Sequence, residues 1–171
     1  MKRLLICLLL VGVVGCGKSE QTQEQSSGET EQAPKQPSKE TEQKAIAALE
    51  RIDPSARIER DDAGNVVSLR FSIGLGSKFR VTDADLEHLK GLASVKKLSL
   101  PYQITDTGLV HLKGLTKLED LRLFFTKISD AGLEHLKSLT KLEKLDLEVT
   151  QVTDAGIAGL QKVLPNCEIK H

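Results

Sequence analysis

Residues 104–123 read ITDTGLVHLKGLTKLEDLRL, and residues 128–147 repeat the same phrase as ISDAGLEHLKSLTKLEKLDL. Residues 81–100 (VTDADLEHLKGLASVKKLSL) are a looser copy, and residues 152–169 are a fading one. Successive copies begin 23, 24 and 24 residues apart. A fixed period of this length with leucines in register predicts a solenoid, in which each repeat buries its apolar face against its neighbours.

Each repeat contains a helical pattern followed by a strand pattern. Residues 109–115 read LVHLKGL, which places three leucines on one face of a helix. Residues 118–123 read LEDLRL, and here the last leucines alternate with polar residues, as they do in a strand with one buried face. The repeats therefore predict a parallel sheet with a layer of short helices packed behind it.

These repeats resemble the leucine-rich repeat family over residues 81–169. The family's consensus places Asn or Cys after the strand, where the side chain bonds backbone amides in a ladder. Thr126 and Thr150 take that place here, so we expect a weaker ladder. The resemblance implies an α/β fold, a short right-handed leucine-rich repeat solenoid with a parallel sheet on one face and short helices on the other. It assigns residues 81–171 to these repeats, with a truncated last repeat, and implies protein binding.

Residues 40–80 are predicted to form an N-terminal cap that ends in the first strand of the sheet. Apolar residues recur at helical spacing over residues 40–52, Ser38 or Thr41 is placed to cap the helix, and Pro54 blocks its continuation. A solenoid leaves one end of its core open, and a helix at this position would cover it.

A hairpin is expected to follow this helix. Residues 57–60 and 66–71 are β-prone, and residues 61–65 (DDAGN) between them have the composition of a turn. The second run matches the leucine spacing of the repeat strands, so we expect it to be the first strand of the solenoid sheet. Residues 74–80 (GLGSKFR) are expected to form a loop, either a connector or a binding loop.

Residues 1–15 have the pattern of a secretory signal peptide. Lys2 and Arg3 precede an uncharged apolar run that is too short to cross a bilayer as a helix, and residues 13–16 read VVGC. This ending resembles the lipobox of bacterial lipoproteins, which implies that Cys16 is lipidated and becomes the N-terminus. The alternative is an ordinary cleaved signal with a chance cysteine. On the lipobox interpretation the protein is exported and anchored to a bacterial membrane, facing the periplasm or the cell surface.

Residues 16–39 are predicted to be the lipidated Cys16 and a disordered linker. Residues 19–39 contain one Ala and no larger aliphatic or aromatic residue, so they cannot bury enough surface to offset their ordering entropy. We expect a spacer between membrane and domain. A recognition tail is the alternative, with only composition to support it.

Composition and motifs exclude several classes of function. Because Lys2 and Arg3 are the only charges before Cys16, a chain that starts there has 22 of the 24 basic residues and all 24 acidic ones. A nucleic-acid-binding protein would show a basic excess, so we expect none of that activity. The sequence also has no nucleophile–base pairing, no Gly-rich phosphate loop and no converging metal set, which predicts that the protein is not an enzyme and holds no cofactor.

Two polar rows invite a metal interpretation, and each has a simpler explanation. Asp residues follow Thr or Ser at the start of each helical piece, where they can cap the helix or, less simply, line up to bind calcium. These are Asp83, Asp106, Asp130 and Asp154. Histidines precede a stripe leucine in three repeats, where a solvated row is favoured over a zinc site because parallel side chains do not converge. These are His88, His111 and His135.

Cys167 is the only cysteine in the predicted solenoid. The last unit aligns Cys167 with Leu145 and Ile169 with Leu147, so we expect Cys167 to be buried as a small hydrophobic residue and not to act as a reactive thiol.

The exposed face of the sheet is predicted to be polar, with one exception. Alternation predicts that the following residues project from it: Ser68, Arg70, Ser72, Lys97, Ser99, Pro101, Asp120, Arg122, Phe124, Lys144, Asp146, Glu148 and Glu168. Phe124 breaks the polar pattern beside Arg122. Phe125 and Tyr102 lie close by in adjacent repeats and are either exposed with Phe124 or turned inward.

Exposed aromatic residues beside an arginine are typical of a protein-binding site. The candidate partner-binding residues are Tyr102, Asp120, Arg122, Phe124, Phe125, Asp146 and Glu148. The sequence thus predicts a monomeric, membrane-anchored extracytoplasmic module that binds an unidentified protein on its sheet face and the membrane through the lipid on Cys16. A structural envelope lipoprotein is the alternative, and a non-enzymatic inhibitor or regulator of a partner enzyme is a third interpretation.

Overall fold

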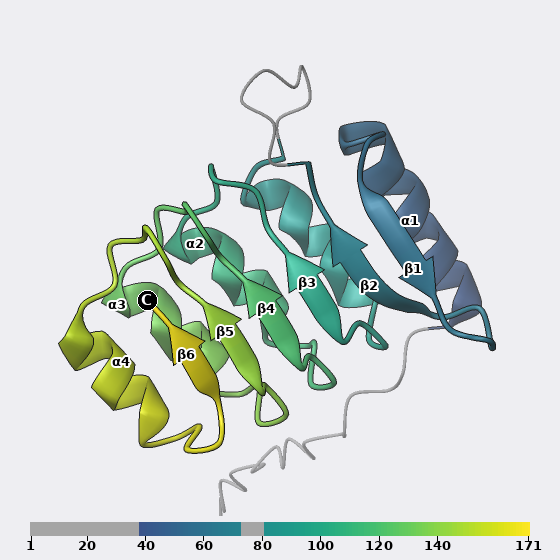
Figure 1. Ribbon diagram of the computed structural model, residues 1–171. Helices are drawn as coiled ribbons and strands as arrows, with labels where there is room; N and C mark the ends of the chain where they lie inside the picture. Colours follow the sequence, from purple (N-terminus) through teal and green to yellow (C-terminus); the bar gives the residue numbers. More distant parts are fainter. Residues whose placement is uncertain (1–37, 73–80) are drawn as a thin grey trace, which may run out of the picture. The chain divides into compact units, whose positions relative to one another are not determined.

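The computed structural model describes residues 38–72 and 81–171, which form a six-stranded sheet with helices along one face (Figure 1). The strands lie across the sheet in their order along the chain, from β1 to β6. The predicted signal peptide (residues 1–15), Cys16 with the linker up to residue 37, and the predicted loop at residues 74–80 lie outside the described residues.

The predicted capping helix is confirmed as α1 (Lys39–Ile52), which begins one residue earlier than expected. Ser38 is its N-cap, and the Ser38 side chain accepts a hydrogen bond from the Thr41 amide at 3.3 Å. The helix ends at Asp53, whose amide donates to the Leu49 carbonyl. One face of α1 is buried and packs against the first repeat; its residues are Ala45, Ile46 and Leu49.

The predicted hairpin is also confirmed. β1 (Arg57–Arg60) and β2 (Val66–Arg70) are antiparallel, and the turn between them uses Gly64 at a φ of +83°, which glycine adopts without strain. β2 then pairs in parallel with β3 (Lys97–Ser99). The hairpin is therefore both the cap and the first parallel strand of the repeat sheet.

The remaining strands are short and in register. β4 (Asp120–Arg122), β5 (Lys144–Asp146) and β6 (Glu168–Lys170) each pair in parallel with the strand before. The middle residues of neighbouring strands oppose one another, so one row of aliphatic side chains crosses the sheet, buried from β2 to β5 and partly buried at β6. Its members from β2 to β6 are Leu69, Leu98, Leu121, Leu145 and Ile169.

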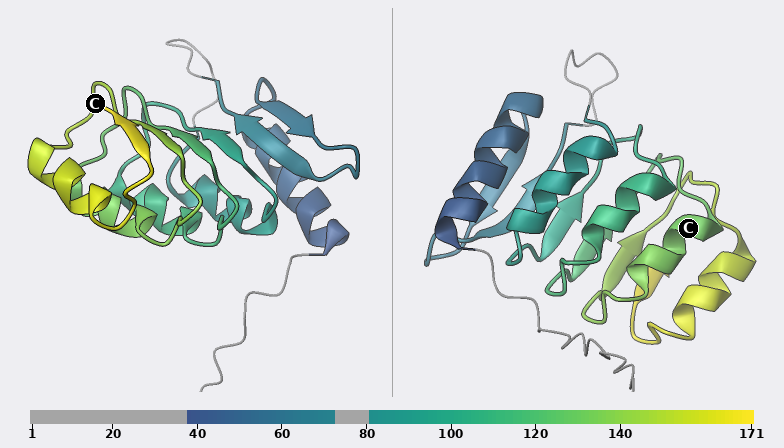
Figure 2. Two further views of the ribbon diagram at one scale, coloured as in Figure 1. Left: turned by 60° about the horizontal axis from the view of Figure 1, so that its bottom comes forward. Right: turned by 180° about the vertical axis from the view of Figure 1, so that it is seen from behind.

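The helices lie behind the sheet, one per repeat, as the rear view in Figure 2 shows. The first repeat has a 3₁₀ helix, and the two middle repeats have a single α-helical turn that continues as 3₁₀ helix. These elements are η1 (Ala84–Gly91), α2 (Asp106–Leu109), η2 (Val110–Leu112), α3 (Asp130–Leu133), η3 (Glu134–Leu136) and α4 (Asp154–Gln161). None of the helices in the described part of the chain is both long and apolar enough to span a bilayer.

The core between sheet and helices consists almost entirely of leucine, isoleucine and valine, with Phe71 as the only buried aromatic side chain among the described residues. Cys167 is buried as predicted, with 4% of its surface exposed. Burial, followed by the nearby Glu168 carboxylate, raises the pKa of the Cys167 thiol to about 11. The thiol therefore stays protonated and packs as an apolar group at neutral pH.

The predicted alignment of the last unit is wrong by two residues. Ile169 opposes Leu145, and not Leu147, across the β5–β6 pair. Cys167 instead occupies the turn before the strand, where its amide bonds the Leu164 carbonyl as the Leu142 amide bonds that of Leu139. The last unit reaches its strand from this turn with one residue fewer than the repeats before it, and the leucine spacing alone did not reveal this.

A ladder of aspartates joins consecutive repeats on the side where each helix begins. The Asp83 carboxylate accepts hydrogen bonds from the amide and the hydroxyl of Thr105 at 2.9 and 2.5 Å. Asp106 makes the same pair of bonds with Ser129 at 2.8 and 2.5 Å. Asp130 makes them with Thr153 at 2.8 and 2.7 Å, and these bonds lower the pKa of Asp130. Asp83, Asp106 and Asp130 are called the aspartate ladder below.

The ladder changes two predictions. Asp was expected to cap its own helix, whereas its carboxylate bonds the next repeat. The hydroxyls of Ser129 and Thr153 do accept amide bonds as N-caps. Thr126 and Thr150 were expected to form a weak ladder, but their hydroxyls donate to the carbonyls of Leu123 and Leu147 in the same repeat. The role that the family consensus gives to Asn is thus performed by Asp at another position.

The glycine of each Thr/Ser-Asp-x-Gly motif makes room for this ladder. A β-carbon at Gly108 would stand 2.5 Å from an oxygen of the Asp83 carboxylate, and at Gly132 and Gly156 it would come closer still to the preceding aspartate. Real β-carbons do not approach other atoms so closely. The residues of this motif are therefore explained by the contacts that stack one repeat on the next.

Candidate functional site

A row of polar side chains, one from each strand, crosses the exposed face of the sheet. Cross-strand pairing places the members of this row directly beside one another. From β1 to β6 they are Arg57, Arg70, Ser99, Arg122, Asp146 and Lys170. Three arginines thus gather on the first four strands, with one small residue among them.

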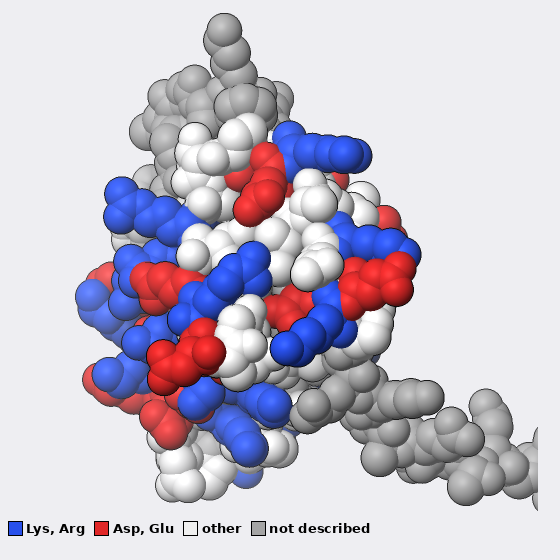
Figure 3. All heavy atoms as spheres, turned by 90° about the vertical axis from the view of Figure 1, so that its right-hand side faces the viewer, with Lys and Arg blue, Asp and Glu red and all other residues white. Residues whose placement is uncertain are grey.

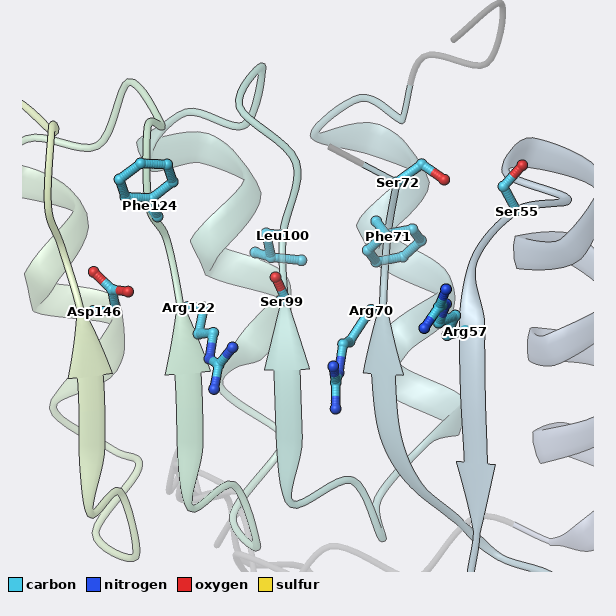
Figure 4. A pocket seen from close by; sticks show the side chains of 10 residues that line it. All are labelled: Ser55, Arg57, Arg70, Phe71, Ser72, Ser99, Leu100, Arg122, Phe124 and Asp146. Carbon is cyan, nitrogen blue, oxygen red and sulfur yellow. The ribbon is translucent and has the colours of Figure 1, made fainter. Parts of the chain in front are cut away.

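The members of this row from Arg57 to Asp146 line a hollow with a volume of about 680 Å³. Figure 4 shows the arginine side chains coming from β1, β2 and β4, with the short Ser99 side chain between Arg70 and Arg122. Phe124 stands at the carboxyl end of β4, on the other side of the hollow from the guanidinium groups. A second, smaller hollow continues from it along Lys97 and Asp120.

Ser99 lies in the floor of the hollow, between the longer side chains of Arg70 and Arg122. It was predicted to project into solvent, as were Ser68 and Pro101, and all three predictions of exposure are wrong. Ser68 and Ser99 are only 2% and 8% exposed, and Pro101 is also buried. On the strands, a short side chain such as Ser68 or Ser99 is shielded at its sides by longer side chains from adjacent strands, which alternation alone does not predict.

A buried carboxylate fixes the rim of the hollow. Asp53 is 1% exposed and accepts hydrogen bonds from the Ser55 amide at 3.0 Å and from the Ser72 amide at 2.7 Å. The Ser72 hydroxyl donates to the same carboxylate at 3.2 Å. Asp53 therefore ties the end of α1 to the end of β2, which holds two serines at the edge of the site. The sequence analysis did not identify Asp53 as part of the site. The available signal was an acidic residue directly before Pro54, at the end of the predicted helix.

The arginines of the hollow are weakly paired. The shortest Arg70–Glu59 and Arg122–Asp120 separations are both 3.6 Å, longer than a charge-assisted hydrogen bond. The side chains of Arg70 and Arg122 are 50% and 56% exposed. Arg57 has no ion pair within the described parts of the chain. Positive charge in the hollow is thus largely free to meet a ligand.

On the last two strands, the row members Asp146 and Lys170 both have partners within the protein. Lys170 lies 2.7 Å from the Glu148 carboxylate, whose hydrogen bond and charge raise the pKa of Lys170. Asp146 accepts a hydrogen bond from the Glu148 amide at 3.1 Å. Asp146 and Glu148, both candidate partner-binding residues, are half-buried and already engaged.

Phe124, Phe125 and Val149 form an apolar patch beyond the carboxyl ends of β4 and β5. They are 40%, 55% and 60% exposed. The two phenylalanine rings contact each other with centroids 5.4 Å apart, and the Phe125 amide bonds the Glu148 carbonyl beside Val149. The sequence left open whether Phe125 and Tyr102 are exposed or turned inward. Phe125 is exposed, whereas Tyr102 is half-buried. Val149 was not predicted as part of the site.

Two residues of the apolar patch have an unfavourable backbone conformation. Phe125 and Val149 occupy equivalent positions in successive repeats with φ of +63° and +57°. For residues other than glycine, a left-handed backbone conformation costs roughly 1–2 kcal/mol, and a β-branched residue such as Val149 rarely adopts it. Bulky residues thus stand where glycine would be easier, and they expose their side chains.

No cluster of three metal-ligating side chains occurs within residues 38–72 and 81–171. The aspartates of the ladder spend their oxygens on the next repeat, and the three row histidines are half-buried. Figure 3 shows Lys and Arg interspersed with Asp and Glu around the end of the molecule that carries α1 and β1. No extended basic surface is visible from this side.

Comparison with known proteins agrees with this architecture. Residues 114–137 match the family model described as "Leucine Rich repeat", which confirms that the repeat unit is a leucine-rich repeat. No curated protein matches the chain. Solenoids of stacked repeats present extended surfaces that such proteins use for binding partners.

Two solved structures illustrate the similarity. An internalin (inlF) from Listeria monocytogenes shares 24% identity over 49% of this chain, with a TM-score of 0.41. The leucine-rich repeat ectodomain of the receptor kinase SOBIR1 from Arabidopsis thaliana shares 15% identity over 78% of this chain, with a TM-score of 0.40. This chain spans 24% of the internalin and 92% of the ectodomain.

Proposed function

We propose that the protein is a lipid-anchored, extracytoplasmic module that binds another protein on the exposed face of its sheet. The observation that carries the proposal is the hollow beside the apolar patch, where Arg122 and Phe124 stand on one strand and its extension. Exposed aromatic side chains next to arginine supply apolar area and directional hydrogen bonds together, the combination typical of residues that dominate binding energy.

The anchoring part of the proposal rests on the sequence of residues 1–16, a basic start, an apolar run and VVGC. Changing Cys16→Ser should abolish acylation and release the protein from the membrane fraction, because Cys16 is the proposed site of lipidation. Metabolic labelling with a fatty acid and cell fractionation measure the two effects. Continued acylation of the Cys16→Ser chain would refute a lipid on this residue.

The binding part is tested by the double variant Phe124→Ala with Arg122→Ala. Both side chains are exposed and lie outside the core, so we expect loss of partner capture with an unchanged melting temperature. Cross-linking in cells followed by mass spectrometry measures capture. A matched control is Val110→Ala with Lys113→Ala, which removes an exposed apolar residue and a cation from the helical face. Capture that survives the first variant, or that is lost equally in the control, would exclude the sheet face as the binding surface.

The same cross-linking experiment separates a binding module from a structural envelope lipoprotein. A few discrete partners support the module. One abundant envelope component that dominates the cross-links would instead support a structural role.

A further inference from the structure

The hollow concentrates positive charge in a way that folding does not require. Arg57 and Arg70 lie directly opposite each other on antiparallel strands, an arrangement in which like charges destabilise a sheet. Their neighbours offer little compensation, because Arg70 has only the 3.6 Å contact to Glu59 and Arg57 has no ion pair in the described residues. A cluster that lowers stability and lines a hollow is typical of a binding site.

The shape of the row suggests the spacing of the ligand's charges. Neighbouring strands lie about 4.8 Å apart, so Arg70 and Arg122, on either side of Ser99, are about 10 Å apart along the row. One anion seated between Arg57 and Arg70 and a second seated over Ser99 would then be about 7 Å apart. Alternate side chains on one face of an extended peptide have about the same separation.

The chemistry of arginine narrows the ligand further. A guanidinium group binds carboxylates through two parallel hydrogen bonds, and it is less strongly hydrated than an ammonium group. Ser99 leaves the space above it open for such a group, since its own side chain is short and buried. Phe124, on the far side of the hollow, offers an apolar surface to a side chain pointing away from the arginines.

The row limits how many acidic residues the ligand can place along it, because its charge changes sign after Arg122. After Arg122 comes Asp146, which would repel a further carboxylate at the next position. The row therefore favours two acidic residues separated by one residue, followed by neutral or basic ones.

We propose that this hollow recognises an extended acidic segment of the protein partner, with carboxylates on alternate residues held by Arg57, Arg70 and Arg122. The inference rests on the proposed protein-binding function and specifies the chemistry of the partner. The segment lies across the strands, with one carboxylate between Arg57 and Arg70 and the next over Ser99.

The test uses the full chain in detergent and the peptide X-Ser-Glu-Leu-Glu-Ser-Gly-NH2, in which X is a fluorescent dye that blocks the N-terminal amine. Fluorescence anisotropy should show binding that weakens about tenfold or more when both Glu residues are replaced by Gln, since each charged hydrogen bond contributes enough for such a change. Arg70→Gln should weaken binding of the acidic peptide to a similar degree. Arg51→Gln, the same substitution on the exposed end of α1, is the matched control and should change nothing.

Unfolding in urea distinguishes a binding role of Arg70 from a role in stabilising the fold. Arg70→Gln should leave the midpoint unchanged or raise it, because it removes a like-charge pair with Arg57. A large loss of stability in Arg70→Gln would assign Arg70 to the fold and overturn the inference.

Three further outcomes would also overturn it: equal binding of the acidic and the Gln peptides, no binding of the acidic peptide at millimolar concentration, or displacement of the peptide by an equal concentration of inorganic phosphate. The last result would show a site for a single anion. Failure of the inference is distinguishable from failure of the proposed function. If the chain with Arg57→Gln and Arg70→Gln still captures the partners found by cross-linking, the acidic-segment inference fails while protein binding stands.

Discussion

The two turns of each repeat have opposite properties. Where the chain enters a helix, the aspartate ladder satisfies its polar groups through the next repeat, and glycines open the space it needs. Where the chain leaves a strand, Phe125 and Val149 adopt a left-handed backbone and expose large apolar side chains. One turn is optimised for stacking and the other departs from what stacking needs. The apolar patch, which is part of the proposed binding surface, lies at this second turn.

The largest expected effect comes from filling the space beside the ladder. Gly132→Ala places a methyl group against the Asp106 carboxylate and should lower the free energy of unfolding by about 3 kcal/mol, the upper range for overpacking. Urea unfolding measures it. Gly159→Ala is the matched control, because a β-carbon there meets nothing within 4 Å and α4 should gain about 0.5–1 kcal/mol. Equal effects of the two substitutions would contradict the role of Gly132.

Removing the ladder carboxylate should have a somewhat smaller effect. Asp106→Ala loses the hydrogen bonds to the amide and hydroxyl of Ser129, which should cost about 2 kcal/mol. Once the carboxylate is gone, the methyl group of Gly132→Ala no longer clashes with it. The double variant should therefore be clearly less destabilised than the sum of the single variants. Additive losses would show that Asp106 and Gly132 do not depend on each other.

At the turn where the chain leaves β5, a substitution is expected to stabilise the protein instead of destabilising it. Val149→Gly should raise the free energy of unfolding by about 0.5–1 kcal/mol, because relief of the left-handed conformation exceeds the added entropy of the unfolded chain. A thermal melt measures this, and partner capture should fall in the same variant. Val110→Gly removes an exposed valine from a position with a φ of −55° and should be destabilising. A lower melting temperature for Val149→Gly would mean that the valine stabilises the turn.

Acid should weaken the ladder by the smallest and most gradual effect. Hydrogen bonds from the amide and then the hydroxyl of Thr153 lower the pKa of Asp130 below its ordinary 3.8. A lowered folded pKa means that this contribution to stability is present above about pH 4 and is lost as pH falls through the folded pKa. Melting temperatures between about pH 6 and pH 2 should therefore decline less steeply in Asp130→Asn than in the parent chain. Parallel curves would show that Asp130 does not contribute.

Much of the fold follows from local patterns that the sequence displays directly. The helix at residues 39–52, the hairpin and the register of the leucine strands depend on spacing within one repeat or one hairpin. The ladder was not predicted because each aspartate acts on a residue that only stacking brings near. Its signal was nevertheless present, since glycine recurs two residues after aspartate in three motifs.

The candidate site was predicted only in part. Arg122, Phe124 and Asp146 were identified and line the hollow, while Asp120 lines its smaller continuation. Arg57 was missed because it belongs to the hairpin edge, and only the sheet places it beside Arg70. The buried Ser99 was missed because its effect depends on the size of its neighbours. Arginine at the end of β2 and of β4, together with arginine at the start of the antiparallel β1, is the signal that would have revealed the row.

The aspartate ladder also determines which segments of the chain can be duplicated or interchanged. Residues 104–127 and 128–151 each present one carboxylate forward and one hydroxyl with its amide backward, so their mating surfaces are interchangeable. An extra copy of residues 128–151 inserted after Gln151 should therefore lengthen the solenoid by one turn. The arginine row on β1 to β4 would keep its spacing, because the insertion comes after it. The protein thus provides a modular scaffold whose length and recognition surface can be varied independently.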